Sequence, residues 1–393
     1  MKNSKKETPK ILACGPTSLN GITGLALAFD LFIDALQKEN IDYIVVDSSS
    51  RRSGITAGSF SLGRVLESLL IVLRVSIHLK KTGYFYCTMS TSLGGFLREW
   101  VCVRLARLFG NQIYLHLHGG GFGIFYHNQG LFFQRMILHH LNRVDGVIVL
   151  GEKLKEQFLK AGVSETLLKV VPNGLPTGLK SHRVEAKSIE EAATINILYL
   201  SNLMESKGVF DVIECVKILE TEFPGRFRLR ICGDFVLTKQ DEDQQIRNVQ
   251  GLLDLLHQMG LETAVEYLGT VKGEAKEAVL EQAHIFALPT YYEWEGQPIS
   301  IIEAQAYGIP SVVTKHRGIP EQVIEGKTGK FVPPRDPKAI SKAIREIAED
   351  ADLYHRMSIL CIENFKKNFT REAHQKKLLS VLFNDSGLNN NER

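Results

Sequence analysis

The sequence predicts an α/β protein built from two Rossmann-like, doubly wound domains that face each other across a cleft. Strand-like apolar runs alternate with amphipathic helical patterns through both halves of the chain. Such alternation gives parallel sheets with covered faces. A stretch rich in Ser, Lys, Glu and Ala, residues 175–194, separates the two alternations and is expected to be a linker. At 393 residues the chain is long enough for two domains of about 150 to 200 residues each.

The first alternation fills residues 1–174. Its strands are short apolar runs, and its helices repeat apolar residues at spacings of three and four. In chain order we expect a strand at 10–14, a helix at 25–38, a strand at 41–46, helices at 62–79 and 96–108, strands at 112–117 and 144–150, a helix at 152–161 and a strand at 168–171. The helices at 62–79 and 96–108 carry arginines beside apolar positions. We expect their apolar faces to be core, and contact with a lipid surface is the alternative.

The second alternation fills residues 195–368. We expect strands at 195–200, 227–232, 265–268, 285–288, 311–314 and 329–332, and helices at 209–222, 245–259, 276–282, from Pro298 to near Gly308, 319–325, 337–350 and 351–368. Residues 369–393 are expected to form a C-terminal helix and a disordered tail. The helix, at 371–382, is expected to pack back on the first domain.

The net charge of +3 hides an asymmetry between the two halves of the chain. Residues 1–173 hold 20 Lys and Arg against 12 Asp and Glu, which gives +8, and the remainder holds 27 against 32, which gives −5. A basic surface attracts anionic lipid headgroups over roughly a Debye length, ~8 Å in the cell. We therefore expect an anionic membrane surface as a partner and no nucleic acid, with an accidental imbalance on a solvated surface as the alternative.

Cysteines and apolar runs indicate the compartment. The six cysteines are scattered without a Cys-x-x-Cys pair, and several lie in apolar runs, which favours buried thiols in a reducing cytosol. The polar N-terminus lacks the apolar centre of a signal peptide, and no apolar run approaches the ~20 residues of a membrane span. We expect a cytoplasmic protein that is peripheral at the inner face of the membrane.

No cofactor or metal is expected. The run Asp241-Glu242-Asp243 has a metal-chelating form, but it lies in a polar stretch that is typical of a solvated loop. No His, Cys or Glu cluster has the spacing of a zinc site.

The segment from Glu295 to Glu303 carries the strongest indication of a binding site. An apolar strand ends at Leu288, a polar loop follows, and Pro298 suits the first turn of an amphipathic helix. Glu295 should lie just outside that helix and Glu303 inside it. A helix N-terminus at the carboxyl end of a parallel strand binds phosphate, and carboxylates accept hydrogen bonds from sugar hydroxyls. A nucleotide diphosphate sugar carries both groups.

Motifs along nearly the whole chain occur in the order found in one enzyme family. They are the Gly21 to Gly24 loop, His118-Gly119, Val171 to Gly174, Leu200 to Leu203 with Lys207-Gly208, Ile231 to Gly233, Tyr267 to Gly269, Ala287 to Pro289, Glu295 to Ala304, Gly308 to Pro310, Gly318 to Glu321 and Gly326 to Gly329. Together they resemble a family 4 (group 1) retaining glycosyltransferase of the two-domain GT-B class. The resemblance implies a nucleotide-sugar site in the second domain and an acceptor site in the first.

The resemblance also implies roles for residues of the second domain. Glu303 would accept hydrogen bonds from the ribose hydroxyls, Glu295 would face the donor sugar, and Lys207 would neutralise the leaving diphosphate. Read alone, both glutamates are ordinary acids near a helix start. Glu293 has the wrong spacing to replace Glu295. The remaining donor-binding residues implied are Gly296, Gln297, Pro298, Ile299, Ser300 and Gly269.

In the first domain, His118 resembles the histidine that reaches the donor sugar. His116 is a weaker candidate for that role, and a core histidine is the alternative. Asn20 and Gly21 stand where the family has a Gly-Gly loop for the acceptor and phosphate, and only the second glycine is kept.

The chain departs from the family pattern at Asn202, where an arginine usually stands, because an amide donates a hydrogen bond but cannot neutralise charge. Either Asn202 is a tolerated variant with a catalytic role, or Lys315 or Arg317 supplies the missing cation.

The sequence thus predicts transfer of a hexosyl unit from a nucleotide diphosphate sugar to a hydroxyl of a saccharide or lipid-linked acceptor, in surface polysaccharide or glycolipid biosynthesis. The family resemblance implies that the transfer retains the anomeric configuration. Retention without an obvious nucleophile suggests front-side attack. The alternatives are a nucleotide-sugar epimerase of the same fold class and a non-catalytic subunit that binds the sugar nucleotide.

Overall fold

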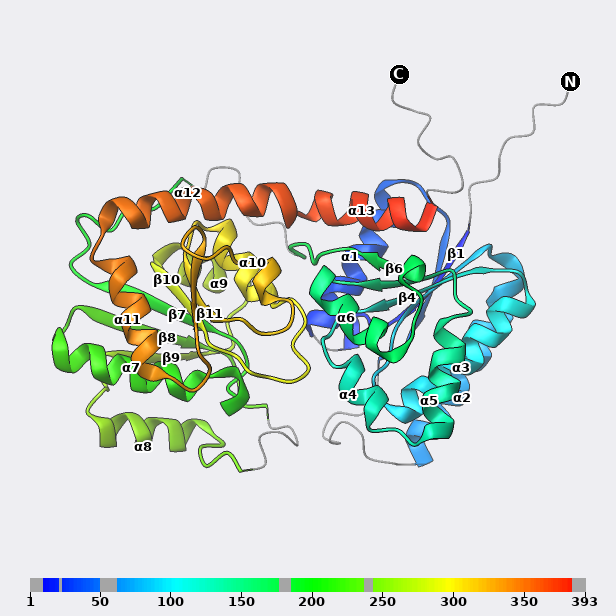
Figure 1. Ribbon diagram of the computed structural model, residues 1–393, viewed down its shortest axis with the longest axis horizontal. Coiled ribbons are helices and arrows are strands. Elements are labelled where there is room, and N and C mark those ends of the chain that lie inside the picture. The colour runs from blue at the N-terminus through cyan, green and yellow to red at the C-terminus, as the bar shows by residue number, and fades with distance from the viewer. Residues whose placement is uncertain (1–9, 21–22, 50–61, 177–184, 237–242, 384–393) are drawn as a thin grey trace, which may run out of the picture. The chain divides into compact units, whose positions relative to one another are not determined.

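The computed structural model describes residues 10–20, 23–49, 62–176, 185–236 and 243–383. The chain divides into two compact units, one of residues 1–176 with 371–393 and one of residues 177–370. Each unit contains a parallel sheet with helices on both of its faces (Figure 1). The prediction of two Rossmann-like α/β domains is confirmed, and the cleft between them stays a prediction.

The sheet of the first unit has six strands in the order β2-β1-β3-β4-β5-β6. Every neighbouring pair is parallel. The strands are β1 Ile11–Gly15, β2 Tyr43–Asp47, β3 Tyr84–Thr88, β4 Gln112–Leu117, β5 Gly146–Val149 and β6 Leu168–Val170. The helices of this unit are α1 Gly24–Lys38, α2 Leu62–His78, α3 Leu93–Leu108, α4 Phe122–His127, α5 Leu131–Leu141, α6 Glu152–Ala161 and α13 Arg371–Phe383.

Helix α13 is part of the core of the first unit although it comes last in the chain. Leu378 and Leu382 are buried in one apolar cluster with Phe29 and Phe32 of α1. The Gln375 amide donates to the Leu31 carbonyl at 3.0 Å. The expected return of the C-terminal helix to the first domain is confirmed, and Figure 1 shows α13 beside α1.

The second sheet has the strand order β12-β11-β10-β7-β8-β9, again with parallel neighbours. Its strands are β7 Ile195–Leu200, β8 Phe227–Cys232, β9 Val265–Gly269, β10 Ile285–Leu288, β11 Ser311–Thr314 and β12 Gly329–Val332. The helices are α7 Val209–Glu222, α8 Val249–Met259, α9 Gly273–Gln282, α10 Ile299–Ala306, α11 Pro337–Ala348 and α12 Ala351–Asn368. The first and fourth strands, β7 and β10, are neighbours at the centre. This pair is the switch point, where the strand order reverses direction and where such sheets bind ligands.

Several elements differ from those expected. The sequence analysis missed β3, α4 and α5, which occupy apolar stretches without a clear period. The helix expected at 319–325 is a single 3-10 turn, Ile319–Glu321. Helix α10 is not amphipathic, since every residue from Ile301 to Ala306 is buried. It ends at Ala306, and Pro298 is its cap residue, one position before the first turn.

Helix α2 overturns one expectation about burial. Its Ile71 and Val75 are buried, but Leu66, Leu69, Leu73 and other large apolar residues are more than half or nearly half exposed. The apolar face of α3, by contrast, is core, as expected. Within the ranges that the structure describes, no helix is both long enough and apolar enough to cross a bilayer.

Candidate functional site

The candidate site lies at the switch point of the second sheet. Strand β10 pairs with β7, with Ile285 opposite Ile197. The chain leaving β7 forms the 3-10 helix Glu205–Lys207, and the chain leaving β10 forms the loop that contains Thr290 and Glu295. Because the carboxyl ends of parallel strands meet at one edge, two loops far apart in sequence come together here.

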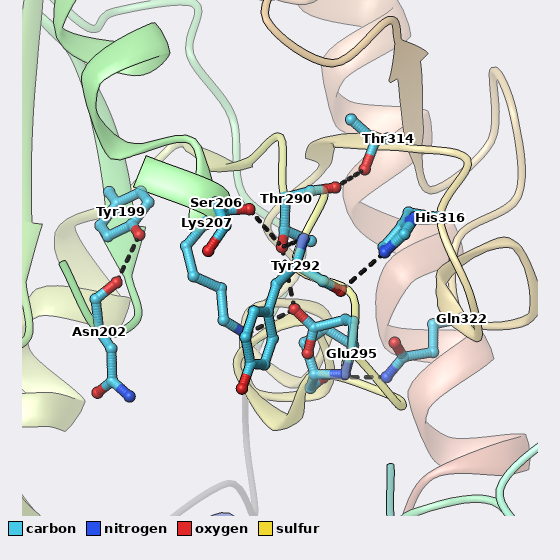
Figure 2. A network of polar contacts seen from close by, with 11 residues as sticks. Tyr199, Asn202, Ser206, Lys207, Thr290, Tyr292, Glu295, Thr314, His316 and Gln322 are labelled. Carbon is cyan, nitrogen blue, oxygen red and sulfur yellow. Dashed lines mark hydrogen bonds and ion pairs between the residues drawn. The ribbon is translucent and has the colours of Figure 1, made fainter. Parts of the chain in front are cut away.

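Lys207 and Glu295 form an ion pair in this site. The Lys207 Nζ lies 2.5 Å from the Glu295 Oε2, and the two side chains are only 12% and 8% exposed. The Thr290 hydroxyl lies 3.1 Å from the same carboxylate oxygen. The Lys207 ammonium also lies over the Tyr292 ring, 4.9 Å from its centroid. Figure 2 shows this group: the lysine reaches from the β7 side to the carboxylate on the β10 side.

Buried hydrogen bonds hold the loop after β10 in place. Thr290 is fully buried, and its hydroxyl also accepts the Tyr292 amide at 3.2 Å. The Thr314 hydroxyl donates to the Thr290 carbonyl. His316 lies 2.8 Å, through Nε2, from the Tyr292 carbonyl. Burial lowers the pKa of His316, which favours the neutral ring with the proton on Nε2. These hydrogen bonds fix the path of the loop that carries Glu295 (Figure 2).

Two glycines let the surrounding loops approach closely. Gly208 has φ +77°, and a Cβ there would lie 2.8 Å from the Pro289 carbonyl oxygen. The Gly318 amide donates to the Gly296 carbonyl at 3.2 Å, and a Cβ on Gly318 would lie 2.5 Å from that oxygen. A side chain at either position would push apart the loops that carry the ion pair.

The start of α10 follows the same loop. Gly296 and Gln297 are buried, while Pro298, Ile299 and Ser300 are half-buried. The cap residue Pro298 offers no side-chain hydrogen bond to the first turn. Its carbonyl accepts the Gln322 amide at 3.0 Å, which fixes the direction in which the helix begins.

Glu303 lies on α10 and is 5% exposed. Its Oε1 accepts from the Lys276 Nζ of α9 at 2.8 Å. Burial raises the pKa of Glu303, and the charge and hydrogen bond of Lys276 oppose that rise. Sequence reasoning missed Lys276, because it is one of many lysines on helices and only the packing of α9 brings it to the glutamate. It also missed Thr290, although its place just after a central strand was a usable indication.

The other predicted residues of this unit lie apart from the ion pair. The exposed side chain of Asn202 points away from it, and the Asn202 carbonyl accepts the Tyr199 hydroxyl at 2.8 Å (Figure 2). Gly269, at φ +66°, ends β9. Lys315 lies over the Phe331 ring at 5.3 Å. Arg317 precedes Gly318, has φ +49°, and its Nε is buried with no hydrogen-bond partner in the described residues.

Three histidines gather in the first unit. His118 follows β4, and its ring stacks on His116 with centroids 3.8 Å apart. His116 is fully buried and lies 2.7 Å, through Nδ1, from the Tyr86 hydroxyl, which agrees with a core role. Burial, followed by the charge of His374 on α13, lowers the pKa of His118 to about 3. The ring is therefore neutral at neutral pH.

Two predictions concern loops that the structure describes only in part. Asn20 ends the 3-10 helix Ser18–Asn20, and Gly21 lies outside the described residues. Asp241 and Glu242 also lie outside them. Over the described part of the chain, no three His, Cys, Asp or Glu side chains are grouped in a way that would hold a metal ion.

Residues 183–359 match the family model described as glycosyl transferases group 1. This match spans nearly all of the second unit, residues 177–370, so the second unit is similar to group 1 glycosyltransferases. The match covers the segment that holds Lys207, Glu295 and Glu303.

Curated proteins also align with about half of the chain. A putative colanic acid biosynthesis glycosyltransferase, WcaL, of Salmonella typhimurium is 31% identical over 193 residues, which are 48% of this chain and 45% of that protein. A D-inositol 3-phosphate glycosyltransferase of Corynebacterium diphtheriae is 27% identical over 47% of this chain and 41% of its own. The chain thus spans about half the length of the curated relatives it matches.

Solved structures match the whole glycosyltransferase-like fold. Anabaena Alr3699/HepE in complex with UDP-glucose aligns with a TM-score of 0.71 and 18% identity, over 96% of this chain and all of that chain. The lipopolysaccharide outer core galactosyltransferase WaaB aligns with a TM-score of 0.67 and 17% identity, over 96% and 99%. At this identity the likeness establishes the fold, which is GT-B.

Proposed function

We propose that this protein transfers a hexosyl unit from a nucleotide diphosphate sugar to a hydroxyl of a saccharide or lipid-linked acceptor, with retention of configuration, as a member of family 4. The observation that carries the proposal is the buried Lys207–Glu295 pair at the switch point of the second sheet. A cation and a carboxylate fixed at that edge match a ligand with a diphosphate at one end of the reacting bond and hydroxyls at the other.

Lys207 is the group proposed to stabilise the leaving diphosphate. Cleavage of the sugar–phosphate bond builds negative charge on the leaving oxygens, and a fixed cation stabilises the transition state more than the ground state. The ammonium is already positioned by Glu295 and the Tyr292 ring. Donor binding would draw it from the carboxylate toward the phosphates.

Arg317 is the better candidate for the cation that Asn202 does not supply. Its buried Nε has no hydrogen-bond partner among the described residues, and it precedes the glycine that contacts Gly296. Lys315 instead stacks on Phe331, and the Asn202 side chain is exposed. An Arg317→Gln variant should bind the donor at least tenfold more weakly, whereas Lys315→Gln should bind it almost as wild type does.

Glu303 is proposed to accept the ribose hydroxyls, with Lys276 holding one of its oxygens. A buried carboxylate with a raised pKa needs a cation nearby to remain ionised, and Lys276 supplies it. The amides of Ile299 and Ser300, at the start of α10, and the Gly296 to Pro298 backbone would contact the diphosphate sugar.

Glu295 is proposed to position the donor sugar. The acceptor hydroxyl would attack the sugar on the same face from which the leaving group departs. The Glu295 carboxylate already interacts with Lys207 and Thr290, as suits a hydrogen-bonding residue more than a nucleophile. Glu295→Gln should lower the rate and keep donor binding. A glycosyl adduct trapped on Glu295 would contradict front-side attack.

The first unit is proposed to bind the acceptor, through the loop of Asn20 and Gly21, and to bring His118 to the donor sugar. The neutral imidazole would supply a hydrogen bond and no charge. The relatives named for colanic acid and amylovoran biosynthesis support a role in surface polysaccharide or glycolipid assembly. We propose an anionic membrane surface as a partner and a cytoplasmic location at its inner face. No metal is proposed in the reaction.

The first experiment is a thermal-shift screen of UDP-, GDP- and ADP-sugars without metal. UDP-glucose comes first, because Anabaena Alr3699/HepE has been solved in complex with it. We expect one donor to raise the melting temperature of the wild type and not of Glu303→Ala. Glu293→Ala, an exposed acid of the same loop, is the control and should respond as wild type does. Stabilisation without any turnover would favour a non-catalytic subunit, and an altered free sugar nucleotide would favour an epimerase.

A further inference from the structure

Helix α2 exposes a stripe of large apolar side chains. Leu66, Leu69, Leu73 and Ile77 are 59, 60, 55 and 59% exposed, and Leu70 is 44% exposed. Their spacing of three and four residues places them on one side of the helix. We call these five residues the α2 stripe. Isolated exposed leucines are ordinary, but five on one helix face are not.

The α2 stripe is not the face that packs on the protein. Ile71 and Val75 are buried on the opposite side, where α2 contacts β1, β2 and α3. Helical geometry puts Ile71 and Val75 about 140° and 180° from Leu66. The helix therefore has two apolar faces, and the fold of the first unit uses only one of them.

Basic residues accompany the α2 stripe. Residues 62–110, which run from α2 through α3, contain seven Lys and Arg and two Glu. One of these two, Glu99, is buried and pairs with His140 at 3.1 Å, so it does not offset charge at the surface. Arg74 lies at the edge of the stripe, and Lys80 and Lys81 are exposed just beyond the end of α2.

Positive charge also gathers on the neighbouring helices α3 and α5. The charges of Arg143 and Arg104 lower the pKa of the exposed His139. Arg104 itself lies over the Trp100 ring, 4.9 Å from its centroid. Positive charge of this kind on the first unit favours an anionic partner.

We propose that the α2 stripe inserts into the interfacial region of an anionic lipid bilayer, with Arg74, Lys80 and Lys81 on the headgroups. An apolar helix face edged by basic residues is the pattern of helices that lie in the plane of a membrane interface. The inference deepens the proposed function, on whose membrane partner it rests, by naming the element that makes the contact. A second copy of the chain is a less suitable occupant, because a symmetric pairing of α2 would bring two basic surfaces together.

A fluorescent reporter on the stripe tests the insertion directly. All six native cysteines are buried, so Leu69→Cys gives one exposed thiol for an environment-sensitive dye. We expect its emission to shift to the blue and rise at least twofold with vesicles that contain phosphatidylglycerol. The control is Leu253→Cys on α8, also an exposed leucine, at 46%, which should show no shift. A thiol at 69 that resists labelling in the native protein would overturn the proposal, since another segment would then cover the stripe.

Vesicle sedimentation with charge-introducing variants separates the contribution of apolar insertion from that of electrostatic attraction. Leu69→Asp with Leu73→Asp should lower binding to phosphatidylglycerol vesicles at least tenfold, and Leu253→Asp should leave it unchanged. Binding of the wild type should fall as salt rises, and should be weak on pure phosphatidylcholine. Circular dichroism should show all variants folded, because the changed residues are exposed. Equal binding of the double variant and wild type would overturn the proposal.

Two further readouts complete the test. A wild-type dimer in sedimentation velocity that the double variant loses would assign the stripe to a second copy and overturn the lipid assignment. The donor thermal shift should be the same in the double variant as in wild type. In the wild type, a donor shift without vesicle binding would overturn the membrane proposal alone, and vesicle binding without a donor shift would overturn the donor proposal alone.

Discussion

At the scale of single residues, the candidate site depends on charges that the fold removes from water. Glu303 is buried and keeps an elevated pKa even beside Lys276. The charged form of such a group destabilises the folded protein above its folded pKa, because the folded state holds the proton more tightly than the unfolded chain does. Lys276 reduces that penalty, so its removal should be felt at high pH and not at low pH.

We therefore expect Lys276→Met to lower the free energy of unfolding by about 2 kcal/mol at pH 8, the size of a lost hydrogen bond to a charged group. The loss should be much smaller near pH 5, where Glu303 is increasingly protonated. Urea unfolding at the two pH values measures this. In Glu303→Gln with Lys276→Met the pH dependence should disappear, and a loss that is equal at both pH values in the single variant would contradict the explanation.

The histidines of the first unit predict its response to acid. Burial lowers the pKa of His116, His118 and His374, so the folded state binds fewer protons than the unfolded chain below pH 6.5. The stability contributed by the neutral rings is complete above pH 6.5. It falls as the pH drops toward the folded pKa values, by about 1.4 kcal/mol per pH unit for each histidine.

Thermal melts from pH 7 to pH 4.5 test this, with His374→Gln as the comparison. The His374 Nδ1 lies 2.6 Å from the Pro172 carbonyl, and a glutamine amide is able to donate there. The stability of this variant should fall less steeply than that of wild type as the pH drops, by the contribution of one histidine. A slope identical to that of wild type would mean that His374 is protonated in the folded protein.

Sequence reasoning reached part of this residue-level picture. It identified Glu295 from its place after the strand at 285–288 and Lys207 from the family resemblance, and the structure brings the two together, because β7 and β10 are central and parallel. It did not find that Glu303 pairs with Lys276, since that contact depends on how α9 packs beside α10. Contacts between helices are not encoded in local patterns, whereas the edge at which parallel strands end is.

At the scale of elements, Gly208 shows how one turn sets the position of Lys207. It is both the end of the 3-10 helix that carries Lys207 and the cap of α7, with φ +77°. A Cβ would meet the Pro289 carbonyl at 2.8 Å. An alanine therefore faces two penalties, the left-handed backbone, about 1 to 2 kcal/mol, and the contact.

Gly225 provides the matched comparison. It has φ +74°, and a Cβ there meets nothing within 4 Å. Gly225→Ala should carry the backbone penalty alone, whereas Gly208→Ala should cost at least 1 kcal/mol more and weaken donor binding by displacing Lys207. Urea unfolding and the donor thermal shift measure both. Equal losses in stability in the two variants would contradict this explanation, because the loop after β10 would then move away from the new Cβ without a cost in free energy.

The elements themselves were predicted with uneven success, for physical reasons. The strands at 195–200, 227–232, 285–288 and 311–314 were placed correctly, since each is an apolar run bounded by polar or turn residues. Strand β3, Tyr84–Thr88, was missed because it is buried along its whole length and lacks alternation. Helices α4 and α5 follow three glycines, and α4 is only six residues long, too short to show a period.

At the scale of the whole molecule, the first unit is built from both ends of the chain. Leu378 and Leu382 of α13 fill the same cluster as Phe29 and Phe32 of α1, and Tyr84 of β3 stacks edge-on against Phe383 at 5.0 Å. The last helix is therefore needed for the first unit, although the family match ends at residue 359. A chain cut after Thr370 should keep the second unit and lose the first.

A single substitution on α13 tests whether the first unit depends on this helix without truncating the chain. Leu378→Ala should destabilise the first unit by about 3 kcal/mol, because the fully buried side chain leaves a cavity. Lys377→Ala, an exposed neighbour on α13, should change stability by less than about 0.5 kcal/mol.

Calorimetry with and without donor shows which unit loses stability in Leu378→Ala, since the domains of one chain do not have to melt together. The donor should still raise the transition of the second unit in Leu378→Ala by as much as in wild type, because α13 belongs to the first unit. The transition of the first unit should move alone. If both transitions fell together, the two units would unfold as one cooperative body, and a helix at the end of the chain would control the stability of the donor site as well as that of the first unit.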